Sequence, residues 1–228
     1  MEREVRTVAI VPSAGSGRRL KARIKKPFVP LGSKPMAIHA LKVLDACDAI
    51  DGIIVASEKS SLTKFKTLIK KAGIRKMIAV VAGGRTRFES VRNCLAKVDD
   101  SFDIVLIHDA ARPLVDKALI RKSIALCKKT GACVVAVRET DTVKLADKDL
   151  FIKSTLDRTR IFRAQTPQVF RRDIIRKAYA LAPADTVTDD ASLVEMLGIR
   201  IKILEGSYRN IKITTREDLK IAEALLCG

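Results

Sequence analysis

The sequence contains few of the residues that build metal centres, disulfide frameworks or base-stacking surfaces. It has no tryptophan, two tyrosines and two histidines, and its five cysteines include no Cys-x-x-Cys pair. These counts exclude a multi-histidine metal centre and indicate reduced cysteines rather than a zinc site. Aromatic residues make up 4% of the chain, which argues against the stacking platforms of single-strand nucleic-acid binders. We expect any metal to be a hard cation held by oxygen ligands.

Long apolar runs are also missing. No run approaches the roughly 18 residues that a membrane span needs, and the N-terminal Met1-Glu-Arg-Glu lacks the apolar core of a signal sequence. We therefore expect a cytoplasmic protein without a membrane segment. A length of 228 residues with 47% hydrophobic content suits a single α/β domain over residues 1–228.

Acidic residues are too few to balance the basic ones. The 44 lysines and arginines against 26 acidic residues give a formal net charge of +18. This charge predicts an anionic partner, and composition alone leaves nucleic acid, acidic lipid and a phosphorylated small molecule open. Many of the lysines can equally be a solvated basic surface.

Short apolar runs that are rich in β-branched residues recur along the chain, as buried parallel strands require. They lie at 8–11, 53–56, 78–81, 104–107 and 133–137. Helical patterns alternate with them at 38–46, 61–72, 89–98 and 116–130. This alternation predicts a doubly wound, mostly parallel, Rossmann-like sheet. Further elements are expected as a short strand near 169, helices at 171–181, 190–197 and 217–226, and strands at 199–204 and 210–213. Residues 138–163 interrupt this alternation of strands and helices, and we expect them to form a protruding β-arm.

The loop Pro12-Ser-Ala-Gly-Ser-Gly-Arg-Arg19 directly follows the first predicted strand. Small residues with glycines at Gly15 and Gly17 let backbone N–H groups turn toward an anion. The spacing fits neither the Walker loop nor the full dinucleotide fingerprint. A glycine pair alone often marks only a tight turn, but cations crowd the residues that follow, at Arg18, Arg19, Lys21, Arg23, Lys25 and Lys26. Together these features predict a triphosphate site.

Two further motifs follow predicted strands. Gly83-Gly-Arg-Thr-Arg-Phe-Glu-Ser90 opens a helix, so its backbone and the Ser90 hydroxyl can meet a nucleobase edge or serve only as a helix cap. His108-Asp-Ala-Ala-Arg-Pro113 stands at the carboxyl end of a strand, where open α/β sheets bind ligands. Asp109 can hold Mg²⁺ and Arg112 can clamp a phosphate, unless the pair is a structural salt bridge.

These motifs resemble the sugar-phosphate nucleotidyltransferase superfamily and, within it, the 2-C-methyl-D-erythritol 4-phosphate cytidylyltransferases. The similarity continues through five more segments, so that it spans about Val8 to Leu225. The segments are Asp141-Thr-Val-Lys144, Asp157-Arg158, Gln165-Thr-Pro-Gln168, Thr188-Asp-Asp-Ala-Ser192 and Asn210-Ile-Lys-Ile-Thr214. Ordered matches of this kind indicate a specific family rather than a shared fold alone.

The resemblance implies a role for each matched residue. Catalysis is expected from Arg19, Lys26 and Lys212, with Lys25 an open alternative to Lys26. CTP is expected to contact Pro12, Ser13, Ala14, Gly15, Gly17, Gly83, Gly84 and Ser90. The acceptor is expected to contact Asp109, Arg112, Thr142, Arg158, Thr166 and Thr188, with Asp109 also holding Mg²⁺. The arm is expected to join two copies into a homodimer, so that Arg158 serves the neighbouring subunit. An extended arm exposes strand edges that a second chain could cover, which agrees with this expectation.

The implied activity is transfer of CMP from CTP to 2-C-methyl-D-erythritol 4-phosphate, with release of pyrophosphate. The attacking phosphate is already an anion, so positioning and charge neutralisation are expected to suffice without a general base. Ribitol 5-phosphate is the alternative acceptor, and Ala110-Ala111 favours methylerythritol phosphate by resemblance only. A basic nucleic-acid-binding protein is the alternative from another class. It would need aromatic contacts or a groove-fitting helix that the sequence lacks, so we expect no nucleic acid as partner.

Overall fold

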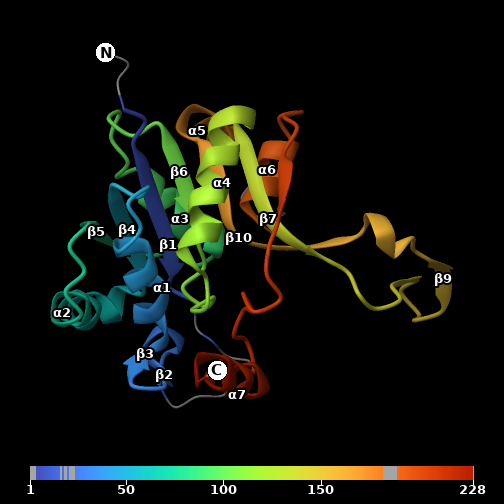
Figure 1. Ribbon diagram of the computed structural model, residues 1–228, viewed down its shortest axis with the longest axis horizontal. Coiled ribbons are helices and arrows are strands. Elements are labelled where there is room, and N and C mark those ends of the chain that lie inside the picture. The colour runs from blue at the N-terminus through green and yellow to red at the C-terminus, as the bar shows by residue number, and fades with distance from the viewer. Residues whose placement is uncertain (1–3, 16, 18–19, 21–23, 182–188, 228) are drawn as a thin grey trace.

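A seven-stranded sheet forms the centre of the computed structural model, which describes residues 4–15, 17, 20, 24–181 and 189–227 (Figure 1). The strand order is β11-β7-β10-β6-β1-β4-β5. The bounds are β1 Thr7–Ser13, β4 Gly52–Ser57, β5 Met77–Ala82, β6 Ile104–Ile107, β7 Ala132–Arg138, β10 Phe162–Arg171 and β11 Lys202–Glu205. Strand β10 runs antiparallel to both of its neighbours, and the other pairs are parallel. The predicted fold class, a mostly parallel doubly wound sheet, is confirmed.

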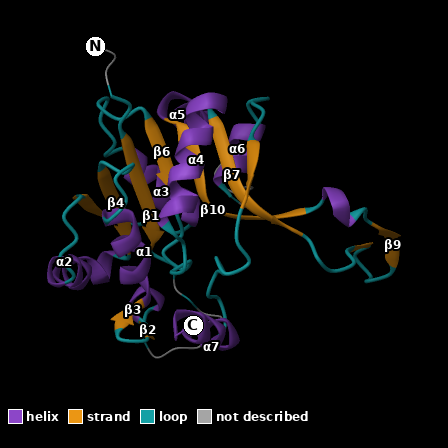
Figure 2. Cartoon of the chain, viewed as in Figure 1, coloured by secondary structure: helices purple, strands orange, loops and turns teal. Residues whose placement is uncertain are grey.

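Helices cover both faces of the sheet, which explains why its strands read as continuous apolar runs. In β1, Ala9 and Val11 pack into one buried cluster with α1, α2 and α4, whereas Val8 and Ile10 pack into another with α3, α5 and α6. Helices α1 and α4 thus lie on one face of the sheet, and α3, α5 and α6 lie on the other (Figure 2). The bounds are α1 Met36–Asp45, α2 Leu62–Lys71, α3 Arg87–Leu95, α4 Lys117–Thr130, α5 Arg172–Leu181 and α6 Asp190–Glu195. A two-layered core of this kind holds the strand ends rigid.

Short elements complete the end of the molecule that lies below the sheet in Figure 1. They are η2 Lys26–Phe28, β2 Pro30–Leu31, β3 Lys34–Pro35, η3 Lys59–Ser61 and the last helix α7 Arg216–Cys227. A third apolar cluster joins this region and consists of Leu20, Val29, Leu31, Met36, Ile213 and Ala222. The cluster fixes the chain after the glycine loop against the C-terminal helix.

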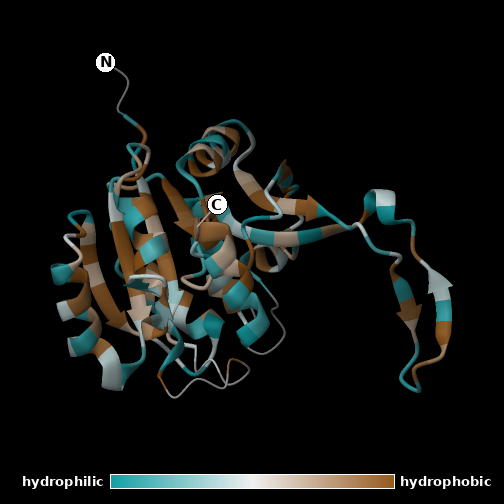
Figure 3. Cartoon of the chain, turned by 60° about the horizontal axis from the view of Figure 1, so that its bottom comes forward, coloured by the Kyte–Doolittle hydropathy of each residue, from teal (hydrophilic) through white to brown (hydrophobic). Residues whose placement is uncertain are grey.

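Residues 138–163 leave the body as an arm, as the sequence predicts (Figure 3). The arm contains β8 Lys144–Ala146 and β9 Ile152–Thr155, which pair with each other in a sheet of their own, and the turn η4 Arg158–Arg160. Its tip exposes apolar side chains, with Leu150 85% exposed and Phe151 72% exposed. Neighbouring apolar side chains that are this exposed at a protrusion are typical of an interaction site.

Two expectations about strands are wrong. Residues 210–213 form no strand, because the Asn210 side chain donates to Gln165 and Thr166 while Ile213 packs into the third apolar cluster. The short strand expected near 169 is ten residues long. It carries buried polar side chains at Gln165, Thr166 and Gln168, which hide the usual apolar pattern.

Candidate active site

A pocket of about 360 Å³ lies at the carboxyl ends of β1, β5 and β6. The chain passes from β1 to β4 and β5 on one side and then crosses to β6 on the other, so the pocket sits at the switch point where such sheets bind ligands. The described lining is Pro12, Ser13, Ala14, Gly15, Lys26, Pro27, Met36, Gly84, Arg85, Thr86, Arg87, Ser90, Asp109, Ala110, Ala111 and Lys212. Segments far apart in sequence therefore converge on one cavity.

The glycine loop forms one wall of this pocket. Ser13 ends β1, and its hydroxyl is buried without a hydrogen-bond partner among the described residues. Gly17 has a φ of +65°, and a Cβ there would lie 2.7 Å from the Cβ of Lys26. The loop thus folds back closely over Lys26, as only glycine permits. Arg19, expected to be catalytic, lies outside the described residues.

Lys25 and Lys26 have different surroundings. The Lys25 ammonium is 2.8 Å from Glu58 Oε1 and donates to Ser60 Oγ at 2.7 Å, on the exposed surface. Lys26 lines the pocket. The two lysines that the sequence leaves as alternatives are therefore separated by the structure, which puts Lys26 at the cavity.

The Gly83–Ser90 segment forms the opposite wall. Thr86 caps α3 by accepting from the Glu89 N–H, and Glu89 accepts in return from the Arg85 N–H. The Ser90 hydroxyl donates to Thr86 O at 2.9 Å and accepts from the Gly84 N–H at 3.1 Å. Ser90 therefore shapes the turn as well as lining the pocket. Gly83 lies beneath the lining, where its N–H donates to Ser57 O.

Asp109 stands between two cations at the end of β6. Its Oδ1 accepts from Arg87 Nε at 3.1 Å, and its Oδ2 lies 2.7 Å from Lys212 Nζ. Burial raises the pKa of Asp109, but Arg87 and Lys212 lower it more, so the pKa stands below its ordinary value. The carboxylate is ionised, and Lys212 reaches it although its segment is not a strand.

A hydrogen-bond chain fixes the backbone on either side of Asp109. The Asp109 N–H donates to Thr166 Oγ1, whose hydroxyl lies 3.1 Å from His108 Nδ1, and His108 Nε2 lies 3.0 Å from Arg112 O. Burial lowers the pKa of His108 to about 4, so the imidazole is neutral and donates through Nε2. Thr166, expected to contact the acceptor, supports Asp109 from behind.

Arg112 turns away from the cavity, contrary to the phosphate clamp that its motif suggests. The side chain is 9% exposed and donates to Asn210 O at 2.7 Å and to Ala164 O at 3.3 Å. It is not among the described residues that line the pocket. These two carbonyl oxygens accept from the terminal nitrogens of the buried guanidinium, whereas Arg112 Nε is buried without a hydrogen-bond partner among the described residues. Arg112 thus braces the segment that carries Lys212.

The two arm residues expected to bind acceptor lie outside the described pocket lining of their own chain. Thr142 is exposed, and Arg158 is exposed and donates to Thr140 O at 2.8 Å. Thr188, the remaining residue of that group, is outside the described residues. Neither of these arm residues therefore contributes to the described pocket lining of its own chain.

Sequence reasoning missed Arg87 and its partner Asp190. Arg87 lies within the predicted Gly83–Ser90 motif. An arginine in the first turn of a helix is usually exposed to solvent, so the motif did not single out Arg87. Its second partner follows 103 residues later, a separation that no local pattern reveals. Burial lowers the pKa of Arg87, but the charges of Asp190 and Asp109 raise it by more, so the pKa stands above its ordinary value. Arg87 is therefore charged at every physiological pH.

The donor set limits how a metal could be held. The described residues include no group of three or more His, Cys, Asp or Glu side chains arranged for a metal ion, and Asp109 is the one carboxylate among the described lining residues. Mg²⁺ is commonly bound by one or two carboxylates together with substrate phosphates rather than by a full protein cage. The site fits a metal brought in with a phosphorylated ligand.

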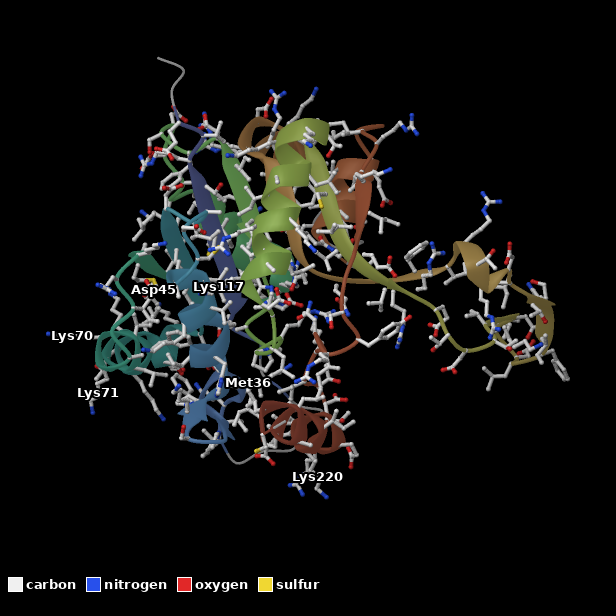
Figure 4. The ribbon with its side chains drawn as sticks, in the orientation of Figure 1. Met36, Asp45, Lys70, Lys71, Lys117 and Lys220 are labelled. Carbon is white, nitrogen blue, oxygen red and sulfur yellow. The ribbon has the colours of Figure 1, made fainter. Side chains whose placement is uncertain are left out.

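The surplus positive charge is spread beyond the pocket. Lys70 and Lys71 on α2 and Lys220 on α7 point away from the body (Figure 4). These side chains are exposed and form part of a solvated basic surface. No helix within the described ranges has the length and apolar character needed to cross a membrane.

The fold and the pocket define an α/β nucleotidyltransferase, in which a glycine loop, facing lysines and a carboxylate meet at the switch point of the sheet. The family model of the 2-C-methyl-D-erythritol 4-phosphate cytidylyltransferases matches residues 7–227. The chain belongs to this family, which confirms the resemblance drawn from the sequence. Because the family is one of enzymes, a nucleic-acid-binding function is not favoured.

Individual relatives agree along nearly the whole chain. The cytidylyltransferase of this name from Syntrophotalea carbinolica is 45% identical, covering 95% of this chain and 94% of that protein. The one from Alkaliphilus oremlandii is 42% identical, covering 99% and 97%. The crystal structure of 4-diphosphocytidyl-2C-methyl-D-erythritol synthase from Anaerococcus prevotii matches with a TM-score of 0.87 and 31% identity, covering 98% and 97%. The fold and the family thus agree.

Proposed function

We propose that this chain transfers CMP from CTP to 2-C-methyl-D-erythritol 4-phosphate, giving 4-CDP-2-C-methyl-D-erythritol and pyrophosphate. This is a step of isoprenoid precursor synthesis by the non-mevalonate route. The observation that carries the proposal is the convergence of the glycine loop, Lys26, Asp109 and Lys212 on one pocket. Such a pocket supplies a backbone cradle for a triphosphate and cations for the charge that develops during transfer.

The reaction is an in-line displacement at the α-phosphorus of CTP. A phosphate oxygen of the acceptor forms the new P–O bond, the bond to the bridging oxygen breaks, and pyrophosphate leaves with that electron pair. The nucleophile is already an anion, so the neutral, inward-facing His108 is not needed as a base. Lys26 and Lys212 stabilise the charge on the transferring group, and we assign Arg19 the same role from its motif.

The nucleotide and the metal have separate supports. Pro12, Ser13, Ala14, Gly15 and Gly17 cradle the triphosphate. Gly84 and Ser90 form the wall that meets the cytosine, and Gly83 supports this wall from beneath. Asp109 is the residue that would hold Mg²⁺ together with phosphate oxygens. When bound, the ion neutralises part of the phosphate charge. The unpartnered Ser13 hydroxyl is available to donate to the nucleotide.

The acceptor side is completed by a second copy of the chain. We assign the acceptor phosphate to Arg158 of a homodimer partner, with Thr142 from the same arm and Thr188 from the subunit's own chain. Exposed apolar residues at the tip, such as Leu150 and Phe151, support pairing through residues 138–163. Both substrates are phosphorylated metabolites that do not cross membranes unaided, which supports a cytoplasmic location.

The test is turnover of radiolabelled CTP with Mg²⁺ and one polyol phosphate at a time. We expect labelled product with 2-C-methyl-D-erythritol 4-phosphate, because the chain matches the family named for this acceptor over residues 7–227. Turnover with ribitol 5-phosphate alone would move the assignment to that acceptor. Absence of turnover with either compound would contradict the proposal.

A further inference from the structure

We propose that Arg87 is a positioning residue for the transfer reaction, which keeps Asp109 in place while Lys212 moves from that carboxylate to the substrate. The inference rests on the proposed function, because it concerns the same pocket. Asp109 contacts Arg87 on one oxygen and Lys212 on the other. A cation that serves the transferring phosphate must give up its present partner, and the carboxylate then needs a second one.

Arg87 is suited to stay because it is anchored behind the pocket. Its NH2 group lies 2.7 Å from Asp190 Oδ2, and Asp190 is fully buried at the start of α6. Tyr179 on α5 donates to the other oxygen of Asp190 at 2.5 Å. The Tyr179 ring also stacks on Phe88, with 4.8 Å between ring centroids. Three helices thus hold the far end of the guanidinium.

Lys212 is suited to move. It lies on a segment without regular structure, its side chain is 41% exposed, and its ammonium is a single charge on a flexible stem. The Arg87 side chain is 28% exposed, and its guanidinium bridges two carboxylates at once. Along the row Lys212, Asp109, Arg87 and Asp190 the charges alternate, so departure of Lys212 still leaves Asp109 beside a fixed cation. The unequal anchoring of the two cations carries the inference.

A purely structural role for Arg87 makes different predictions. If Arg87 only joined α3 to α6, its loss would lower thermal stability and would reduce activity only through the unfolded fraction. A positioning role lowers kcat in the folded enzyme and leaves nucleotide affinity largely unchanged, because Arg87 reaches the reaction through Asp109. The split between kcat and CTP binding therefore separates the two roles.

The experiment compares Arg87→Gln, Arg87→Lys and Asp190→Asn with the wild-type enzyme. Steady-state kinetics with both substrates gives kcat, calorimetry with CTP gives its Kd without turnover, and thermal melting reports folding. For Arg87→Gln we expect kcat to fall about 10- to 100-fold, with the CTP Kd changed less than about threefold. Arg87→Lys keeps the charge but cannot bridge both carboxylates, so it should recover part of the lost kcat.

Asp190→Asn keeps the shape and the contact to Tyr179 but releases the far end of Arg87, and it serves if Arg87→Gln does not fold. We expect a fall in kcat of about tenfold at unchanged CTP Kd. Arg121→Gln is the matched control, because Arg121 forms an exposed pair with Asp48; its kcat should not change. Unchanged kcat in folded Arg87→Gln or in Asp190→Asn would overturn the proposal. An inactive wild type with intact CTP binding would instead refute the proposed function.

Discussion

Gly83 lies directly against Ala14, so closely that a Cβ on Gly83 would be 2.3 Å from the Cβ of Ala14. Gly83 directly follows β5, and Ala14 belongs to the glycine loop, so the two walls of the pocket are in contact at this point. The Ser90 hydroxyl, which holds Gly84, would lie 3.0 Å from the same added atom. This close approach of the two walls requires glycine at position 83.

Replacing Gly83 by alanine should push the glycine loop away from the wall that meets the base. We expect Gly83→Ala to raise the KM for CTP about tenfold or more, because a displacement of about 1 Å can reduce catalysis 100-fold. Steady-state kinetics at saturating acceptor measures the change. The double variant Gly83→Ala with Ala14→Gly removes the overlapping methyl and should restore most of the affinity. A single variant with wild-type KM would contradict the contact.

Lys26 and Lys25 should differ in effect although they are adjacent. Lys26→Ala removes a cation from the pocket, and we expect kcat to fall about 100-fold or more by analogy with the loss of an oxyanion-hole donor. Lys25→Ala removes an exposed pair with Glu58 and should change kcat less than about twofold. Initial rates at saturating CTP and acceptor make the comparison. A larger effect of Lys25→Ala would exchange the two assignments.

Lys212 should act through its charge. Lys212→Ala is expected to lower kcat about 100- to 1,000-fold, corresponding to roughly 2.7–4 kcal/mol of transition-state stabilisation. Lys212→Arg keeps the charge and should retain more activity. Lys220→Ala on α7 is the control, because this lysine points away from the body (Figure 4). Single-turnover rates with enzyme in excess report the chemical step. Equal rates for Lys212→Ala and Lys220→Ala would refute the role.

The arm should allow complementation between two inactive variants. We expect Arg158→Ala and Lys212→Ala homodimers each to be weakly active, since one lacks the lent arginine and the other the pocket lysine. Mixed subunits contain one site with neither defect, so activity should rise after the two proteins are denatured together and refolded. Sedimentation at the same concentration checks that dimers are present. A mixture no more active than its components would contradict an arginine lent across the interface.

Asp218 should contribute to the stability of the fold at neutral pH and lose this contribution at acidic pH. It accepts from Thr214 and from the Thr215 N–H, while Thr215 Oγ1 accepts from the Asp218 N–H, which forms a capping box at the start of α7. Burial raises the pKa of Asp218, and the hydrogen bonds from Thr214 and Thr215 lower it below its ordinary value. The contribution is therefore fully present above the unfolded pKa of about 3.9 and is lost as the pH falls through the folded value.

Asp218→Ala is expected to reduce the free energy of unfolding by about 1 kcal/mol at pH 7, and by less at pH 3. Urea denaturation at the two pH values measures the difference. Glu223→Ala, at an exposed position of the same helix, is the matched control and should have a small effect at both. If Asp218→Ala lowered the free energy of unfolding as much at pH 3 as at pH 7, the predicted loss of the Asp218 contribution at acidic pH would be wrong.

The helices and strands that could be predicted are those whose bounds follow from their own residues, such as a continuous apolar run or a pair of helix caps. The apolar run Ile104–Ile107 is a strand over that same range, because both of its faces are covered. The helix expected at 116–130 is observed at Lys117–Thr130, because Asp116 caps its first turn and Gly131 ends it with a φ of +80°. Local chemistry marks the bounds in these cases.

The misassigned elements depend on partners distant in sequence. Alternating apolar residues at Ile211 and Ile213 suggest a strand, but no neighbouring strand among the described residues pairs with them, and side-chain bonds from Asn210 hold the segment instead. The β10 residues Gln165 and Thr166 look like a turn because they are polar, yet tertiary hydrogen bonds satisfy them in the interior.

The sequence predicted which segments form the site better than it predicted the contacts between their side chains. Motifs locate the glycine loop, Lys26 and Asp109, and these residues do line one pocket. The inward turn of Arg112 and the bridge from Arg87 to Asp190 were not foreseen. A motif identifies the arginine, but folding brings its hydrogen-bond partners from distant segments. The motif alone therefore does not predict the partners.

Strand β10 begins at the arm with Phe162 and continues, four residues later, to Thr166, whose hydroxyl accepts the backbone N–H of Asp109. One strand thus connects the protruding arm to Asp109, the carboxylate that lines the pocket. A displacement of the arm that shifts β10 is therefore expected to move the backbone of Asp109 through the Thr166 hydroxyl, at a distance from the nucleotide itself.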